Sequence, residues 1–264
     1  RMCQKSLQIG FQIITQTDMN NILNKDIQLV EPGHKYILSD NPEITFRSVT
    51  EIIGGFFEPF DKDAIAKKLV SSHPKYRMMT VKDLISMWDA KRDFGTKIHN
   101  EIETCLNDSD YPDKLDLYQY DIKTRYALDW LKQFDLKYDL TTYPEVIIYS
   151  SEINIAGSID VLLYNKKSDS YAIIDWKTSK KIDTKSYNNK MGIHDITKEL
   201  QDCKFVHYSL QLSFYRYILE KYYGLNISNQ LIAHITDNGC VGFKGTYYKE
   251  EVINMIANYQ EGLS

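Results

Sequence analysis

Two stretches of the chain place apolar residues at the three- and four-residue intervals of an amphipathic helix. The first runs from about residue 80 to residue 106, and Gly95 within it predicts a kink. The second covers residues 118–138, and Asp61 opens a shorter helical stretch before both. Residues 60–140 are therefore predicted to form a mostly helical block.

The pattern changes after Tyr143-Pro144. Residues 146–149, 153–163 and 171–176 are rich in β-branched and aromatic side chains, and polar turns separate them. Three strands joined by tight turns predict an antiparallel meander. A helix over 207–222 follows, ended by Gly224, and then come strands over 231–236 and 242–247 and a helix from residue 249.

These elements predict an α/β fold with a small mixed central sheet, an antiparallel meander, flanking helices and a helical insertion. We expect one domain, in which residues 1–33 form a peripheral arm, 60–140 the helical insertion and 143–264 the core. Short strands are expected at 34–38 and 45–46. Ser48 followed by Glu51 has the chemistry of a helix N-cap.

Composition narrows the function classes. The chain has 264 residues, 43% of them hydrophobic, and a net charge of -4, so a nucleic-acid partner would need a local basic patch. The four cysteines are scattered, which favours free thiols in a reducing intracellular compartment. No apolar run approaches the roughly 18 residues of a membrane span. The sequence begins with Arg1 rather than Met, so it is compatible with a fragment of a larger protein or with a chain that has lost a targeting segment.

The strongest candidates for catalytic residues lie on two neighbouring strands. Asp160 is inside one hydrophobic strand, and Asp175 and Lys177 are at the end of the next. The spacing D-x-K is not specific, because it occurs five more times in the chain. Only Asp175 and Lys177 end an apolar strand, where residues two apart share a face. The alternative is a buried salt bridge within the sheet.

A divalent metal would compensate the buried carboxylates. Mg²⁺ or Mn²⁺ takes hard oxygen ligands, so Asp160, Asp175 and the backbone carbonyl of Trp176 are the expected set. Such an ion polarises a phosphoryl oxygen and lowers the pKa of water. Lys177, with a pKa lowered by burial and the metal, is expected to orient or deprotonate that water.

Gly157-x-x-Asp160 followed by Asp175-x-Lys177 resembles the PD-(D/E)xK nuclease superfamily. Flanking matches resemble its branch of RecB-type, Cas4-like and mitochondrial genome maintenance exonucleases. The resemblance implies a metal-ligating role for His99, which follows Gly95-Thr96-Lys97-Ile98 with Glu103 one turn on, although a structural role is the alternative. It makes Glu145 an outer acidic position.

The same resemblance implies roles for Gln211 and Tyr215, which match a Q-x-x-x-Y motif and would contact phosphate or brace Lys177. An ordinary amphipathic helix is the alternative. Ser48 resembles a residue near the start of the nuclease domain in this exonuclease branch. Some members carry four closely spaced cysteines around an iron–sulfur cluster, whereas Cys203 and Cys240 lie far apart here, so no cluster is expected.

We expect the nucleic acid to approach the lysine-rich segment after the catalytic strand. The expected DNA contacts are Ser48, Thr178, Lys180, Lys181 and Lys185. The predicted function is a sequence-nonspecific DNA exonuclease that prefers single-stranded ends. Replication or recombination proteins are its possible partners. The helical block would overhang the cleft, with Trp88, Tyr118 and Tyr126 lining the passage. The alternatives are an endonuclease, of flap, junction or RNA cap-snatching type, and a nuclease-fold binding module of a larger assembly.

Overall fold

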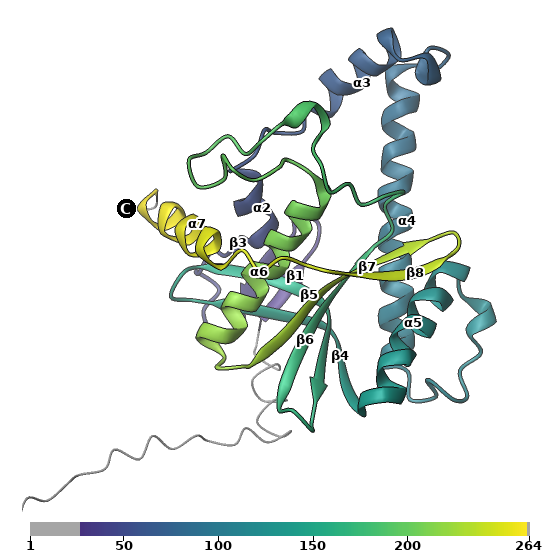
Figure 1. Ribbon diagram of the computed structural model, residues 1–264, viewed down its shortest axis with the longest axis vertical. Helices are drawn as coiled ribbons and strands as arrows, with labels where there is room; N and C mark the ends of the chain where they lie inside the picture. Colours follow the sequence, from purple (N-terminus) through teal and green to yellow (C-terminus); the bar gives the residue numbers. More distant parts are fainter. Residues whose placement is uncertain (1–26, 263–264) are drawn as a thin grey trace, which may run out of the picture.

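A computed structural model describes residues 27–262 of the protein (Figure 1). Residues 1–26, most of the expected peripheral arm, lie outside this part. The strands and α-helices, in chain order, are β1 (Ile27–Val30), β2 (Lys35–Leu38), β3 (Arg47–Ser48), α2 (Val49–Gly54), α3 (Lys62–Ser72), α4 (Val81–Asn107), α5 (Ile122–Tyr138), β4 (Leu140–Ser150), β5 (Ile155–Asn165), β6 (Ser170–Lys177), α6 (Lys204–Tyr222), β7 (Ile227–Thr236), β8 (Gly239–Lys244) and α7 (Lys249–Glu261).

The fold is mixed α/β, as predicted, and its centre is a six-stranded mixed sheet. Strands β4, β5 and β6 form the expected antiparallel meander. Strand β7 is parallel to β6 and is reached through α6, and β8 pairs antiparallel with β7. Strands β1 and β2 form a separate hairpin, so the last part of the expected arm is a strand rather than irregular chain.

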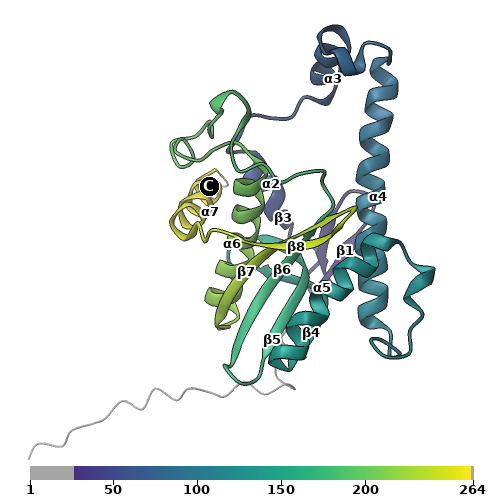
Figure 2. The ribbon, with the colours of Figure 1, turned by 45° about the vertical axis from the view of Figure 1, so that its right-hand side comes forward.

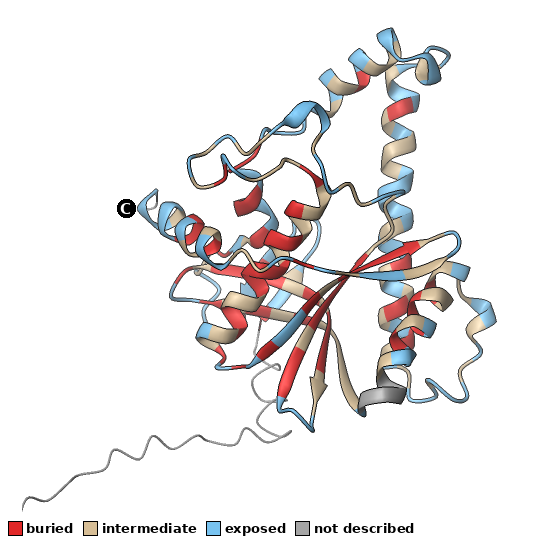
Figure 3. Cartoon of the chain, in the orientation of Figure 1, coloured by how far each residue is buried: buried red, intermediate tan, exposed pale blue. Residues whose placement is uncertain are grey.

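Helices cover both faces of the sheet, because its central strands are apolar on both sides. One core joins α2, α6 and α7 to residues such as Ile159 and Ile173, and the other joins α4 and α5 to neighbours such as Val161 and Ile174. The burial pattern shows these two buried layers against the sheet (Figure 3). The result is a three-layer arrangement with the meander in its middle.

The edge of β5 is shared by two strands. Strand β3 pairs with β5 at Ile155 and Ala156, whereas β6 pairs with it from Val161 to Asn165. Between these pairings the two neighbours diverge, and Asp160 lies at this fork. Asp175 on β6 lies beside it, one residue beyond the last paired position. The sheet therefore brings the two predicted carboxylates, Asp160 and Asp175, together where β3 and β6 diverge beside β5.

The helical block is present, but α4 runs as one straight helix from Val81 to Asn107, without the kink expected at Gly95 (Figure 1). A Cβ at Gly95 would lie 2.9 Å from Oγ1 of Thr178, so this glycine allows α4 to pass close to the end of β6. Helix α3 and the first half of α4 project beyond the sheet (Figure 2). The N-caps predicted at Ser48 and Asp61 are confirmed. Within residues 27–262, no helix is both long and apolar enough to cross a membrane.

Candidate active site

Three side chains from three elements meet at the fork of the sheet. His99 of α4, Glu145 of β4 and Asp160 of β5 each offer a ligand atom, and these atoms lie within 4.8 Å of one another. Nδ1 of His99 lies 3.5 Å from Oδ2 of Asp160. An imidazole and two carboxylates at this separation form a donor set that can hold a divalent metal.

The position of Glu145 follows from the pairing of β4 with β5. Pro144 pairs with Val161 and Val146 with Ile159, so Glu145 lies across from Asp160. Its φ of +47° is rare for a residue with a side chain, and this conformation interrupts the regular pairing. Oγ of Ser158 donates a hydrogen bond to Oε2 of Glu145 at 3.1 Å. The backbone and Ser158 together hold this carboxylate at the fork.

Asp175 and Lys177 lie on the same face at the end of β6, as the strand period predicts. Nζ of Lys177 lies 2.6 Å from Oδ2 of Asp175, and the Asp175 side chain is almost fully buried. The backbone N–H of Trp176, between them, donates to Oδ2 of Asp160 at 2.7 Å. Asp175 and Lys177 therefore form a buried ion pair that adjoins the His99 group.

The carboxylates differ in their affinity for a proton. Burial, together with the nearby Asp160, raises the pKa of Glu145 to about 7. Burial raises the pKa of Asp175 to about 6, although Lys177 opposes it. Burial acts to raise the pKa of Asp160, but the charge and hydrogen bond of His99, the charge of Lys177 and the Trp176 N–H together hold that pKa below its ordinary value. Asp160 is thus the carboxylate that stays ionised most readily.

The charges of the protein around Lys177 oppose the effect of burial on its pKa. Burial lowers it, as predicted, but the charges of Asp175 and Asp160 act in the opposite direction and leave it above its ordinary value. Lys177 therefore keeps its proton at neutral pH. This favours a role as a fixed positive charge over a role as a base.

Helix α6 presents three residues of one face to the same site. Nε2 of Gln211 donates to the hydroxyl of Tyr215 at 3.0 Å, and the ring of Tyr215 is buried. Gly157 makes room for that ring, since a Cβ there would lie 2.4 Å from Cε1 of Tyr215. One turn earlier, the ring centre of Tyr208 lies 4.7 Å from Nζ of Lys177.

These residues lie at the floor of a cleft of about 1370 Å³. Helix α4 forms one wall, and α2 and α6 contribute to the other. The acidic centre is on the floor, and the cationic side chains that line the cleft around it are Lys91, Arg92, Lys123, Lys180 and Lys204. Acidic floor and basic walls are the charge arrangement that suits a bound metal and approaching phosphates.

The predicted site residues divide by position. Those that line the cleft are His99, Asp160, Asp175, Trp176, Lys177, Gln211, Tyr215, Ser48, Thr178 and Lys180. Among the described residues, Lys181 and Lys185 are exposed outside its lining, and Lys181 pairs with Asp183 instead. Of the aromatic residues expected along the passage, Trp88 lines the cleft, whereas Tyr118 and Tyr126 lie outside it.

Sequence reasoning did not identify Tyr208 or Ser158, and it placed Glu145 outside the group of direct ligands. Tyr208 could have been found, because it lies three residues before Gln211 and seven before Tyr215, on one helical face. The place of Glu145 beside His99 and Asp160 could not have been predicted, since it depends on the register of β4 and on a positive φ.

Comparisons with known proteins add little. No family model and no curated protein sequence matches the chain. Among solved structures, one described as the crystal structure of SSO0001 aligns with 83% of this chain and 77% of its own, with 12% identity and a TM-score of 0.37. A likeness at this level supports no argument about function.

Proposed function

We propose that the protein is a metal-dependent nuclease that hydrolyses phosphodiester bonds of DNA without sequence specificity. The observation that carries the proposal is the acidic centre of His99, Glu145 and Asp160, beside Asp175 and Lys177, on the floor of a cation-lined cleft. The resemblance of Gly157-x-x-Asp160 and Asp175-x-Lys177 to PD-(D/E)xK nucleases supports it independently of the geometry.

The donor set fits a divalent cation. Three carboxylates, Glu145, Asp160 and Asp175, adjoin two basic groups, Lys177 and His99. A structural role is fully met by two ion pairs, one between Lys177 and Asp175 and one between His99 and Asp160. Glu145 is then a third carboxylate without a cationic partner among these groups, and burial together with the nearby Asp160 raises its pKa. Mg²⁺ or Mn²⁺ would balance this carboxylate with the hard oxygen ligands that these ions prefer.

A bound cation would supply polarisation of the phosphoryl oxygen and activation of water. The protein's own groups do the positioning. The Trp176 N–H fixes the Asp160 carboxylate, Ser158 fixes Glu145, and α4 presents His99. Lys177, held between Asp175 and the Tyr208 ring, supplies a permanent positive charge that stabilises the negative charge growing on the attacked phosphate.

The proposal extends to single-stranded ends. Helix α3 and the first half of α4 project beyond the sheet, and α4 forms a wall of the cleft (Figure 1). A flexible strand can follow such a wall more easily than duplex DNA, whose persistence length is about 50 nm. This favours a strand that enters from an end over internal cleavage of a duplex.

The test is cleavage of end-labelled linear single-stranded DNA with Mg²⁺ or Mn²⁺ and with EDTA. We expect metal-dependent hydrolysis, and we expect Asp160→Asn to abolish it while DNA binding in EDTA stays within about twofold. Lys185→Ala is the matched control, because this exposed lysine lies outside the cleft lining. Substantial activity of Asp160→Asn would move the active site elsewhere.

Circular single-stranded DNA tests the preference for ends. It should resist the enzyme under conditions that degrade the linear strand. Equal rates on the two substrates would keep the nuclease proposal and replace the exonuclease by an endonuclease.

A further inference from the structure

Helix α4 carries one continuous stripe of side chains along the cleft. Its members are spaced by four, three, four and four residues, which keeps them on one helical face. They are Trp88, Arg92, Gly95, His99 and Glu103, and all five line the cleft. The stripe starts on the projecting half of α4 and ends at the acidic centre. The chemistry changes along it from aromatic and cationic to metal-ligating.

Trp88 forms a ring surface at the outer end of this stripe. It is half-buried, and its ring centre lies 5.9 Å from that of Phe60, which is 68% exposed. The projecting half of α4 has mostly exposed and half-buried residues, whereas its other half buries one face against the sheet through Ile98, Ile102 and Cys105 (Figure 3). The tryptophan is therefore supported from one side by Phe60 and does not belong to either core. An aromatic ring with an accessible face in a cation-lined cleft can stack with an unpaired base.

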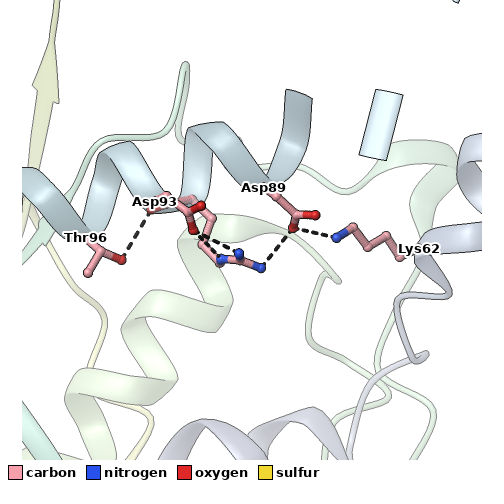
Figure 4. A network of polar contacts seen from close by, with 5 residues as sticks. Lys62, Asp89, Asp93 and Thr96 are labelled. Carbon is pink, nitrogen blue, oxygen red and sulfur yellow. Dashed lines mark hydrogen bonds and ion pairs between the residues drawn. The ribbon is translucent and has the colours of Figure 1, made fainter. Parts of the chain in front are cut away.

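The charges beside Trp88 suit a phosphate backbone. Asp89 accepts from Lys62 of α3 at 2.6 Å and from Arg92 at 2.9 Å, and Arg92 also donates to Asp93 at 2.9 Å. Figure 4 shows how Asp89 links Lys62 of α3 to the rest of the network on α4. With Lys91 there are three cations and two carboxylates, so the cluster keeps a net positive charge. The carboxylates orient the Arg92 guanidinium on the wall.

The length of the stripe fixes a distance. Trp88 and His99 are eleven residues apart, which is about 16 Å along a helix. A stacked strand advances roughly 3.4 Å per nucleotide, so about five nucleotides cover this span. An oligonucleotide of three residues covers roughly 10 Å at the same rise, so it cannot lie on Trp88 and at the metal centre together.

We propose that the Trp88 surface is a base-stacking subsite for single-stranded nucleic acid, about five nucleotides from the bond that is cleaved. Arg92 and Lys91 contact phosphates between the subsite and the centre. The inference rests on the proposed nuclease function for its cleavage distance, but strand binding at Trp88 can be measured without cleavage.

The experiment compares the thymidine oligomers dT12 and dT3 with wild-type protein, Trp88→Ala and Trp88→Phe. Stacking on one aromatic ring is worth roughly 5-fold to 100-fold in affinity. Trp88→Ala should raise KM for dT12 within that range and leave kcat unchanged, and cleavage of dT3 should stay as in wild type. Trp88→Phe should recover most of the loss, because phenylalanine keeps a ring face. Tyr187→Ala removes an aromatic side chain that is 80% exposed and outside the cleft lining, and it is the control.

A second readout is the anisotropy of labelled dT12 in EDTA, where no hydrolysis occurs. We expect the same 5-fold to 100-fold weakening for Trp88→Ala and little change for a blunt 12-base-pair duplex. Equal binding of dT12 by wild type and Trp88→Ala, equal losses on dT12 and dT3, or equal losses on duplex would each overturn the subsite. Binding that depends on Trp88 without any hydrolysis would overturn the nuclease function and keep the subsite.

Discussion

Replacing Gly157 by alanine tests whether the close approach of β5 and α6 shapes the site. The added Cβ would lie 2.4 Å from Cε1 of Tyr215 and 3.3 Å from two further ring atoms. The ring is buried, so it cannot turn into solvent. Overpacking of this kind costs about 1–3 kcal/mol. The loss of chain entropy in the unfolded state offsets about 0.4–1 kcal/mol of that cost at most.

Thermal unfolding is the assay for Gly157→Ala. With an offset near 0.4 kcal/mol the net cost is about 0.6–2.6 kcal/mol, and at about 2–4 °C per kcal/mol for a chain of this size we expect Tm to fall by roughly 1–10 °C. Gly54→Ala is the matched control, since a Cβ at this helical glycine meets nothing within 4 Å. Gly54→Ala should leave Tm unchanged or raise it, because alanine is the better helix former by about 1 kcal/mol.

A double-mutant cycle identifies the cause. Tyr215→Ala removes the ring and opens a cavity, and in that background Gly157→Ala should cost almost nothing. The interaction between the two sites should therefore be on the order of 1–2 kcal/mol, as for residues in direct contact. If Gly157→Ala is as stable as wild type, or if its cost survives the loss of the ring, the packing argument is refuted.

Further outcomes follow from the site. His99→Ala should weaken Mg²⁺ binding by about 10-fold or more in a calorimetric titration; an unchanged titration with a lower Tm would mark His99 as structural. Tyr208→Leu should lower kcat with little change in KM, and Tyr208→Phe should restore it, because the phenyl ring keeps its contact with Lys177; equal activity of the leucine variant would remove Tyr208 from the site. Raised pKa values mean that the folded protein binds protons more tightly than the unfolded chain, so Glu145 and Asp175 make the metal-free protein less stable as pH rises from about 4 towards about 7. The increase in Tm caused by Mg²⁺ should then be larger at pH 8 than at pH 5.5, and equal increases would contradict this.

Much of the fold could be predicted because local patterns and tertiary structure agree. The alternation and β-branched content of the meander predicted β4, β5 and β6, and the caps at Ser48 and Asp61 predicted the starts of α2 and α3. Asp175 and Lys177 were separated from five other pairs of the same spacing because they end an apolar strand. The prediction of a kink at Gly95 was wrong. This glycine instead allows a close approach to Thr178, which lies far away in the sequence.

The rest of the site depends on contacts between distant segments. Lys181 and Lys185 follow β6 in sequence but lie outside the cleft lining, whereas Lys204 enters it on α6. Proximity in sequence predicted the sign of the charge near the site and one of the residues that supply it, Lys180, but not Lys204 or the cations of α4. Long-range packing, which no local pattern encodes, decides which lysines face the cleft.

Glu145 shows what a structural role alone leaves unexplained. Its backbone lies in a region that costs on the order of 1–3 kcal/mol for a residue with a side chain, and its burial raises its pKa to about 7. Both effects weaken the fold, and the two ion pairs of Asp175 with Lys177 and of Asp160 with His99 exist without it. A cation shared with Asp160 and His99 would turn the same carboxylate into a stabilising ligand. The destabilising position of Glu145 therefore supports the proposal that this centre holds a metal.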